Sequence, residues 1–340
     1  MSVGKSSQQD FVAPLDPVSG GLAQLIAAFR LPGLARRVLP SAVIAGMYKT
    51  RREIRKRLFS RGLPRNRVFE QPLEYRAASA SMSIVVPIHD APLVTKRCLA
   101  SLERYAADAE VILVDDASKL PVTINIIREF SRRNGWKVIS NTEARGHSAA
   151  CEAGARLASR PYLCLLNSDT IVTPWCWRAI EEAFEANAEI GVVGPSTSES
   201  WNAQTLEIAS HCRHYWNDNQ ICGFAERLTA APPQPAIVDL PWVCGFAFFI
   251  RRSLWEKLGG FDGNLPDYGN EVELCERVTA MGYRTVWARS SYIHHLGRQS
   301  YANEIGDHGI QSRMLETYRY VLGKRHVQPA DSARQAQSGK

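Results

Sequence analysis

Short apolar runs alternate with amphipathic stretches between residues 83 and 166. The stretches have apolar residues at helical spacing and predict helices over Leu93–Tyr105, Ile124–Asn134 and Ser148–Ala158. Strands that alternate with helices in this way predict an α/β fold, with a mostly parallel central sheet and helices on both faces. The apolar runs are four or five residues long and predict strands at Ser83–Pro87, Val111–Val114, Trp136–Ile139 and Tyr162–Leu166.

The segments outside this region have a different pattern. Residues 1–20 are polar and rich in Ser, Gly and Pro, which predicts a disordered tail. Residues 21–80 predict a basic helical extension that ends in a linker over 61–80. We expect the α/β domain to cover 81–300, and residues 301–340 to form a C-terminal helix and a polar tail.

The composition is that of a globular protein. Of 340 residues, 45% are hydrophobic and 22% charged, which argues against a disordered or collagen-like chain. The eight cysteines contain no CxxC pair, so we interpret them as small hydrophobic residues in a reducing compartment rather than as a zinc site or disulfide framework. No apolar stretch reaches about 18 residues, and the start of the chain lacks a signal-peptide pattern. We therefore expect a cytoplasmic location.

The net charge of +7 is concentrated in one segment, because residues 30–67 carry +11 and the chain beyond them carries −3. Such a charge run is a solvated helix face, a nucleic-acid contact or a site for an anionic membrane surface. The acidic remainder and the absence of an aromatic-rich RNA motif argue against nucleic acid as a partner. We expect residues 21–67 to associate peripherally with the inner face of the cytoplasmic membrane, where Lys and Arg attract anionic lipids.

Acidic residues occur where the predicted strands end. His89–Asp90, Asp115–Asp116 and Asp169 follow three of these strands. In sheets of this kind, ligands bind beyond the carboxyl ends of the strands, and Mg²⁺ is commonly held by one or two carboxylates together with substrate phosphates. The same acids are equally compatible with turns and helix caps. Spacing alone leaves both interpretations open.

Five segments resemble, in order, the motifs of family 2 glycosyltransferases. The resemblance covers about residues 81–300 and implies the GT-A fold for nucleotide-diphospho-sugars. It also implies a nucleotide-binding half at 81–172 and an acceptor half at 173–300. The five segments are Ser83–Asp90, Ile112–Ser118, Leu165–Thr170, the stretch from Gly245 to a GGFD turn at Gly259–Asp262, and Asn270–Arg277, which is similar to the family's ED-x-D-L-C-x-R helix.

The resemblance implies a donor site at the ends of the first strands. Asp169 would be the principal carboxylate on a Mg²⁺ or Mn²⁺ ion, because Asn167 replaces the first acid of the family's DxD motif. Asp115 or Asp116 would accept hydrogen bonds from the base or ribose, and Gly146 would lie in a loop close to the nucleotide. The implied nucleotide-binding residues are Pro87, Ile88, Asp90, Asp115, Asp116, Gly146, Asn167, Ser168 and Asp169.

A late segment with two histidines resembles the family's HH-x-G-x-x-[ST] motif, in which a histidine reaches the metal or the diphosphate. His294 and His295 are therefore implied as metal ligands alongside Asp169, and neutral imidazole is a competent ligand for an ion such as Mn²⁺. Strand alternation allows only one of them to face the site. Arg298 is either a phosphate-binding residue or a solvated surface arginine.

Glu271 matches the family's base, the second acid of the ED motif, and Asn270 replaces the first acid. An inverting transfer needs one carboxylate beside the acceptor hydroxyl and no covalent intermediate, by analogy with inverting glycosidases. The alternative is structural: Asn270 and Glu273 have the spacing of a capping box, which would make Glu271 a first-turn acid. Asp267 is a less favoured candidate for the base.

Substrate contacts are also implied on the acceptor side. Trp242 is either a platform on which a sugar stacks or an ordinary core tryptophan. Acceptor specificity would reside in the loop 197–204, which contains Trp201, and in residues 205–240. The implied substrate-binding residues are Trp242, Gly245, Asp262, Asn270 and Arg298.

These features predict a metal-dependent inverting glycosyltransferase. It would move a sugar from a UDP- or dTDP-sugar to a hydroxyl of a glycan or lipid-linked acceptor in polysaccharide biosynthesis. A nicotinamide-dependent oxidoreductase is excluded, because the first strand is not followed by G-x-G-x-x-G. The replacements at Asn167 and Asn270 leave an inactive, sugar-nucleotide-binding scaffold as the alternative.

Overall fold

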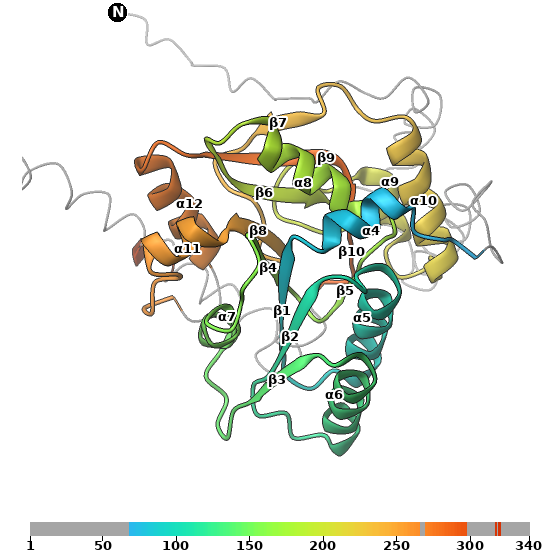
Figure 1. Cartoon of the computed structure of the whole chain (residues 1–340), viewed down its shortest axis with the longest axis vertical. Coiled ribbons are helices and arrows are strands. Elements are labelled where there is room, and N and C mark those ends of the chain that lie inside the picture. Colours follow the sequence, from blue (N-terminus) through green and yellow to red (C-terminus); the bar gives the residue numbers. More distant parts are fainter. Residues whose placement is uncertain (1–67, 266–268, 298–316, 318, 321–340) are drawn as a thin grey trace, which may run out of the picture. The chain divides into compact units, whose positions relative to one another are not determined.

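One sheet of eight strands organises the computed structural model (Figure 1). The structure describes residues 68–265, 269–297, 317 and 319–320, which lie within one compact unit, Phe59–Lys340. The strand order is β3-β2-β1-β4-β8-β6-β9-β7. The strands are β1 (Met82–Ile88), β2 (Glu110–Asp115), β3 (Lys137–Ser140), β4 (Tyr162–Leu166), β6 (Ile190–Ser196), β7 (Ile237–Asp239), β8 (Ala247–Arg251) and β9 (Arg284–Tyr292).

The sheet is mostly parallel, which confirms the predicted fold class. Strands β1, β2, β3 and β4 are paired in parallel, and β6 pairs with β9 in the same way. Strand β8 runs antiparallel to both of its neighbours, β4 and β6, and β7 runs antiparallel to β9. Because β8 is buried on both faces, its sequence has the continuous apolar character of a parallel strand. The sequence pattern therefore did not reveal its direction.

Helices cover both faces of the sheet. In Figure 1, α5, α6 and α8 lie on one side, and α7, α11 and α12 lie on the other. Each layer packs on its own hydrophobic cluster. The helices are α4 (Leu73–Ser79), α5 (Pro92–Tyr105), α6 (Pro121–Asn134), α7 (His147–Ala155), α8 (Cys176–Ala186), α9 (Glu207–Cys212), α10 (Asp218–Ala230), α11 (Arg252–Leu258) and α12 (Asn270–Ala280).

The two clusters follow from the period of two along each strand. On β1, Ile84 and Val86 belong to the cluster that contacts α5 and α8, whereas Val85 belongs to the cluster that contacts α7 and α11. All three side chains are completely buried. Burying an aliphatic side chain of this size contributes about 1.5–3 kcal/mol to the stability of the fold. These buried strands hold in place the sheet edge that carries the polar residues.

Prolines and a glycine set the helix boundaries. Pro92 and Pro121 stand at the first positions of α5 and α6, where the missing N–H costs nothing. Gly135, with φ of 69°, ends α6. The sequence predicted both helices but placed their starts one and three residues too late. It did not predict α4, whose Ala78 is buried in the core within the range interpreted as a linker.

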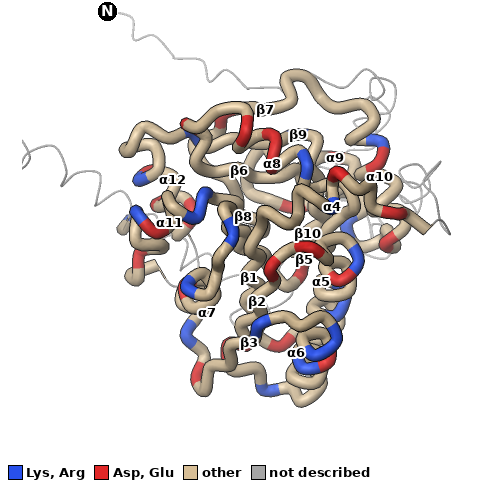
Figure 2. The backbone as a smooth tube through the Cα atoms, in the orientation of Figure 1, with Lys and Arg blue, Asp and Glu red and all other residues tan. Residues whose placement is uncertain are grey.

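Several predictions fall outside the described residues: the disordered tail 1–20, the basic segment 21–67, Arg298, Asp267 and most of 301–340. Within the described part of the chain, no helix is long and apolar enough to cross a membrane. Basic and acidic residues are interspersed there, for example along α6 (Figure 2). Exposed pairs such as Arg133–Glu129 on α6 contribute about 0.3–0.5 kcal/mol each.

Candidate active site

A second, two-stranded sheet brings together the residues that were implied as metal ligands. Strand β5 (Thr170–Ile171) pairs antiparallel with β10 (His294–His295), and His295 lies opposite Thr170. The backbone N–H of Leu296 also donates to the Asp169 carbonyl, at 3.0 Å. This pairing places the chain after β9 against the chain after β4. His295 and Asp169 become neighbours as a result.

The Nε2 atom of His295 lies 3.2 Å from Oδ1 of Asp169. Asp169 is 4% exposed. The other ring nitrogen, Nδ1, is 2.7 Å from the Glu199 carbonyl oxygen. Because a carbonyl only accepts, Nδ1 carries the hydrogen, and in the neutral ring the Nε2 lone pair points toward Asp169. Burial acts to lower the pKa of His295, but the Asp169 carboxylate outweighs it and the pKa is raised.

This pair fits a divalent ion. Two cis ligands about 2.1 Å from an octahedral ion lie about 3 Å apart, which matches the separation between Asp169 and His295. The hydrogen bond from Nδ1 to a carbonyl is the usual second contact of a metal-ligating histidine. Among the described residues, no three His, Cys, Asp or Glu side chains form a metal-binding group. Oxygen atoms of a substrate would have to complete the coordination.

His294 does not approach Asp169. Its Nδ1 is 2.7 Å from the Tyr292 hydroxyl and its Nε2 is 2.9 Å from the Arg213 carbonyl oxygen. Complete burial lowers the pKa of His294 to about 3, so the ring is neutral at physiological pH. Of the two histidines that the sequence left open, the geometry therefore favours His295 as the ligand and gives His294 a packing role.

A small cleft lies at the carboxyl ends of β1, β2 and β4, beside the start of α7. Most of its lining residues were implied by the resemblance. His89 was noted at a strand end without a role, and His147 and Ala150 were not named. His147 Nε2 lies 3.1 Å from Asn167 Oδ1. The positions of the two histidines could have indicated a place at the cleft, because His89 directly follows a strand and His147 begins a helix. The cleft is lined by Pro87, Ile88, His89, Asp116, His147, Ala150, Asn167 and Ser168.

Asp116 holds one wall of this cleft together. Its carboxylate accepts hydrogen bonds from Asn141 Nδ2 and from the backbone N–H groups of Arg145 and Gly146, at 2.8–3.0 Å. Gly146 has φ of 86° and ψ of 166°, a conformation that is available essentially only to glycine. The first turn of α7 is thereby fixed beside the cleft. Both oxygens of Asp116 therefore already accept hydrogen bonds from other groups of the protein.

Asp90 lies in the loop after β1, and Asp115 is the last residue of β2. Asp90 Oδ1 accepts from the backbone N–H groups of Lys119 and Leu120. Asp115 Oδ1 accepts from the N–H of Ser118 at 3.0 Å, and its Oδ2 makes no hydrogen bond within the described residues. Of the two acids proposed for the base or ribose, Asp115 therefore retains an acceptor for a ligand.

Helix α12 carries Glu271 in its first turn, as the structural alternative predicted, but the capping box of Asn270 and Glu273 is not formed. The N-cap is Gly269, with φ of 74°. The Asn270 side chain instead donates to Ser148 Oγ at 2.8 Å. Glu273 forms a bidentate ion pair with Arg277. A glycine can adopt the left-handed conformation that starts this helix, which leaves the Asn270 amide available to contact α7.

The Glu271 carboxyl group lies over Gly245. A Cβ atom added at Gly245 would be 3.5 Å from Glu271 Cδ and 3.6 Å from Oε1. Burial raises the pKa of Glu271, although backbone hydrogen bonds from Glu271, Gly245 and Gly269 act in the opposite direction. A position in the first turn of a helix favours the ionised form of a carboxyl group. Burial of Glu271 has the larger effect on its pKa, which is therefore raised.

Glu271 and His295 contact consecutive residues. Glu271 lies against Gly245, and the ring of His295 stacks on Phe246 with centroids 5.1 Å apart and planes at 17°. The Phe246 carbonyl also accepts from the N–H of Asn167, at 2.9 Å. The segment before β8 therefore connects the predicted base, the predicted metal ligand and the Asn167–Asp169 turn.

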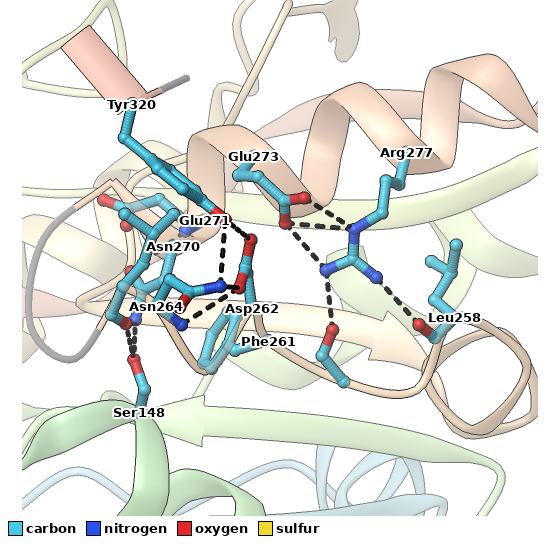
Figure 3. Close-up of polar contacts among 12 residues, drawn as sticks. Ser148, Leu258, Phe261, Asp262, Asn264, Asn270, Glu271, Glu273, Arg277 and Tyr320 are labelled. Atoms are coloured by element: carbon cyan, nitrogen blue, oxygen red, sulfur yellow. Dashed lines mark hydrogen bonds and ion pairs between the residues drawn. The ribbon is translucent and has the colours of Figure 1, made fainter. Parts of the chain in front are cut away.

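Hydrogen bonds join helix α12 to the segment around the GGFD turn, as Figure 3 shows for Arg277 and Leu258. Arg277 donates to the carbonyl oxygens of Leu258 and Gly260, and Glu152 Oε1 accepts from the Phe261 N–H at 2.7 Å. A Cβ at Gly260 would lie 1.9 Å from Glu152 Oε1. The GGFD turn is thereby fixed between α7 and α12.

The two tryptophans of the acceptor half differ in exposure. Trp242 is half-buried and packs against both hydrophobic clusters. Trp201 is 50% exposed and lies two residues after Glu199, whose carbonyl accepts from His295. An exposed aromatic side chain two residues from a hydrogen-bond partner of His295 is better placed to meet a substrate than a half-buried one.

Comparison with known proteins identifies the family. The model of glycosyl transferase family 2 matches residues 83–259, which is more than half of the chain. The chain belongs to this family. A crystal structure of GalNAc-T7 with UDP, GalNAc and Mn²⁺ superimposes with a TM-score of 0.50 at 18% identity, over 63% of this chain and 42% of that one. The fold of this family 2 glycosyltransferase is GT-A, as predicted.

Two curated relatives are similar over most of the domain. The O-antigen biosynthesis protein RfbC of Myxococcus xanthus is 26% identical over 249 residues, which are 66% of this chain and 18% of RfbC. The validoxylamine A glucosyltransferase of Streptomyces hygroscopicus subsp. jinggangensis is 25% identical over 264 residues, 71% of this chain and 60% of the relative. This family 2 glycosyltransferase therefore spans only part of the length of either relative.

Proposed function

We propose that the protein is a metal-dependent inverting glycosyltransferase that uses a UDP- or dTDP-sugar. The observation that carries the proposal is the contact of Glu271 with Gly245 and of His295 with the adjacent Phe246. An acid suited to act as a base and an Asp–His pair suited to an ion are thus held on one short segment. In a direct displacement, the base acts on the attacking hydroxyl and the ion on the leaving diphosphate. Both must therefore lie beside the same reacting carbon.

The donor nucleotide would lie in the cleft at the ends of β1, β2 and β4. Asp115 retains an acceptor oxygen for the base or ribose, and the first turn of α7 presents backbone N–H groups at the cleft. A helix N-terminus favours phosphate groups. The side chains of Asn167 and His147, which contact one another at this wall, could donate hydrogen bonds to the phosphate oxygens.

Asp169 and His295 would hold a Mn²⁺ or Mg²⁺ ion, which supplies positive charge to the leaving diphosphate when bound. Asp169 contributes a hard oxygen ligand and His295 a neutral nitrogen, a mixture that suits Mn²⁺ better than Mg²⁺. Glu199 keeps the His295 tautomer through its carbonyl oxygen. Because the described residues offer only these two ligands here, ion and donor should bind together.

Glu271 would take the proton from the acceptor hydroxyl as that oxygen attacks the anomeric carbon. Its raised pKa makes the carboxylate a stronger base than an exposed glutamate. The bond between the anomeric carbon and the diphosphate oxygen breaks as the new glycosidic bond forms, so the configuration inverts. No second carboxylate is required, because no covalent intermediate forms.

We propose a glycan or lipid-linked acceptor from a polysaccharide pathway. The name of the RfbC relative, an O-antigen biosynthesis protein, supports this class. The exposed Trp201 offers a flat apolar face of the kind that sugar rings pack against. Peripheral membrane association through residues 21–67 remains part of the proposal, although that segment lies outside the described residues.

The direct test is a panel of UDP- and dTDP-sugars incubated with the full chain and Mn²⁺, with released nucleoside diphosphate as the measurement. The proposal predicts release with at least one donor, and its loss in Glu271→Gln. The matched control is Glu276→Gln, on the same helix, which should behave as the parent. If donors bind but none is cleaved, the protein is a sugar-nucleotide-binding scaffold and the proposed activity is wrong.

A further inference from the structure

Tyr320 links the C-terminal part of the chain to the GGFD turn. Its hydroxyl donates to Asp262 Oδ2 at 2.8 Å and accepts from Asn264 Nδ2 at 3.0 Å. Asn264 in turn donates to Asp262 Oδ1 through its backbone N–H and its side chain, at 3.0 and 2.9 Å. The three side chains form a closed hydrogen-bonded cycle, which Figure 3 shows with the Tyr320 ring pointing toward Asp262.

A second contact lies one turn earlier in the same C-terminal segment. A Cβ atom at Gly269 would be 2.2 Å from Thr317 Cγ2. Gly269 has φ of 74° and is the residue from which α12 begins. Thr317 therefore packs directly on the backbone of the helix cap, while Tyr320 contacts the turn that precedes it.

Gly269 is the N-cap of α12, two residues before the predicted base. Burial raises the pKa of Glu271, whereas the backbone groups of Glu271 itself, Gly245 and Gly269 act to lower it and so favour the ionised carboxyl group. The contacts form a short series, from Thr317 to the Gly269 backbone and from there to the Glu271 carboxylate. A displacement of Gly269 would move one of the two glycine backbone groups that hold this carboxylate.

We propose that Tyr320 and Thr317 are positioning residues for transfer: they hold Asp262 and Gly269 so that Glu271 meets the acceptor hydroxyl. The inference rests on the proposed function, because Glu271 is the base only under that proposal. It also reassigns Asp262. Its two oxygens bond to Asn264 and Tyr320, so its main role becomes the attachment of the C-terminal segment, not a contact with the sugar.

The magnitude of the effect follows from the chemistry of the base. A hydrogen bond to a carboxylate is among the stronger ones in proteins, yet Tyr320→Phe leaves the ring and its packing in place. A misplaced catalytic group costs up to about 100-fold in rate. We expect Tyr320→Phe to lower kcat about tenfold, and to leave the donor KM within about twofold because the donor cleft is formed by other elements.

The experiment measures two properties of the full chain, turnover and backbone hydrogen exchange. Tyr320→Phe should lower kcat and should also speed exchange at the Asn264 and Glu271 amides in the free protein. The matched control is Tyr283→Phe. It removes a hydroxyl that makes no hydrogen bond within the described residues, and it should change neither property.

A second pair of variants tests the contact at the helix cap. Gly269→Ala should lower kcat, because the new Cβ clashes with Thr317 Cγ2 and the left-handed conformation is strained for alanine. Thr317→Ala removes that methyl group, and the remaining Cβ would lie 3.5 Å away. In the double variant, kcat should recover in part. A merely destabilising substitution would instead add its loss to that of Gly269→Ala.

Unchanged exchange at Asn264 and Glu271 in Tyr320→Phe would overturn the inference, whatever the activity. So would equal losses in Tyr320→Phe and Tyr283→Phe, or the absence of recovery in the double variant. If exchange accelerates as expected but the parent protein cleaves no donor, the proposed function fails while the contact between Tyr320 and the turn stands. The two failures are therefore distinguishable.

Discussion

The imidazole Nε2 of His295 lies 3.2 Å from the Asp169 carboxylate, although the two residues come from opposite halves of the domain. The pairing of β5 with β10 creates this neighbourhood. We propose that this pair compensates for Asn167, which stands where the family has an acid. With a histidine as the second ligand, one carboxylate on the turn after β4 would be enough to hold an ion that also binds the donor's diphosphate.

The raised pKa of Glu271 predicts the pH dependence of transfer. The base acts only when ionised, and burial raises its pKa above the ordinary value of 4.5. The acid limb of kcat should therefore have its midpoint above pH 4.5, and activity should rise as pH increases through it. Glu271→Gln should lower kcat by about 10²- to 10⁴-fold with donor affinity retained. Near-parental turnover in that variant would mean that another acid is the base.

Trp201 is the residue we expect to contact the acceptor. Trp201→Ala should raise the acceptor KM by about 3- to 10-fold, because an aromatic stacking contact contributes about 0.5–1.5 kcal/mol beyond its area. The donor KM should not change. Leu157→Ala removes a similarly exposed apolar side chain after α7 and serves as the control. A larger effect on the donor than on the acceptor would contradict this assignment.

Substitution of Glu110 should lower the stability of the protein without changing catalysis. Glu110 accepts hydrogen bonds from Ser83, Lys137 and Ser159 at the amino end of β2, opposite the edge that carries the cleft. Glu110→Gln should lower the melting temperature by a few degrees at pH 7. It should leave kcat and both KM values unchanged, and a loss of kcat would show that the two edges are coupled.

The same variant has a predicted pH dependence. Burial acts to raise the pKa of Glu110, but its hydrogen bonds outweigh burial and lower the pKa to about 2. A depressed carboxyl pKa contributes stability above the unfolded value, near 4.5, and that contribution is lost as pH falls toward 2. The difference in melting temperature between the parent and Glu110→Gln should therefore shrink as pH drops below about 4.5.

The sequence was most informative where burial is complete. The predicted strand Tyr162–Leu166 has the observed bounds, because an apolar run between turn residues leaves little choice of register. The helix α4 was missed because it is short and lies in a polar context. Its place in the core depends on contacts of Phe69 and Ala78 with distant residues, which local patterning does not contain.

The site was predictable as a set of residues but not as a set of contacts. Sequence order and the family resemblance pointed to Asp169, Glu271 and the two histidines. The choice of His295 depends on the β5–β10 register and on the Glu199 carbonyl, neither of which has a local signal. The contact between Tyr320 and Asp262 joins segments far apart in the chain. Such contacts are set by tertiary packing alone.

The proposed mechanism depends most on Asp169 and His295 holding a divalent ion together with the donor nucleotide. Titration calorimetry of UDP and dTDP, with and without Mn²⁺, tests it on the parent, Asp169→Ala and His295→Ala, with His211→Ala on α9 as the histidine control. The account predicts that Mn²⁺ tightens nucleotide binding to the parent and to His211→Ala, by about tenfold or more, and that both site variants lose this gain. An undiminished Mn²⁺ effect in Asp169→Ala would contradict the account.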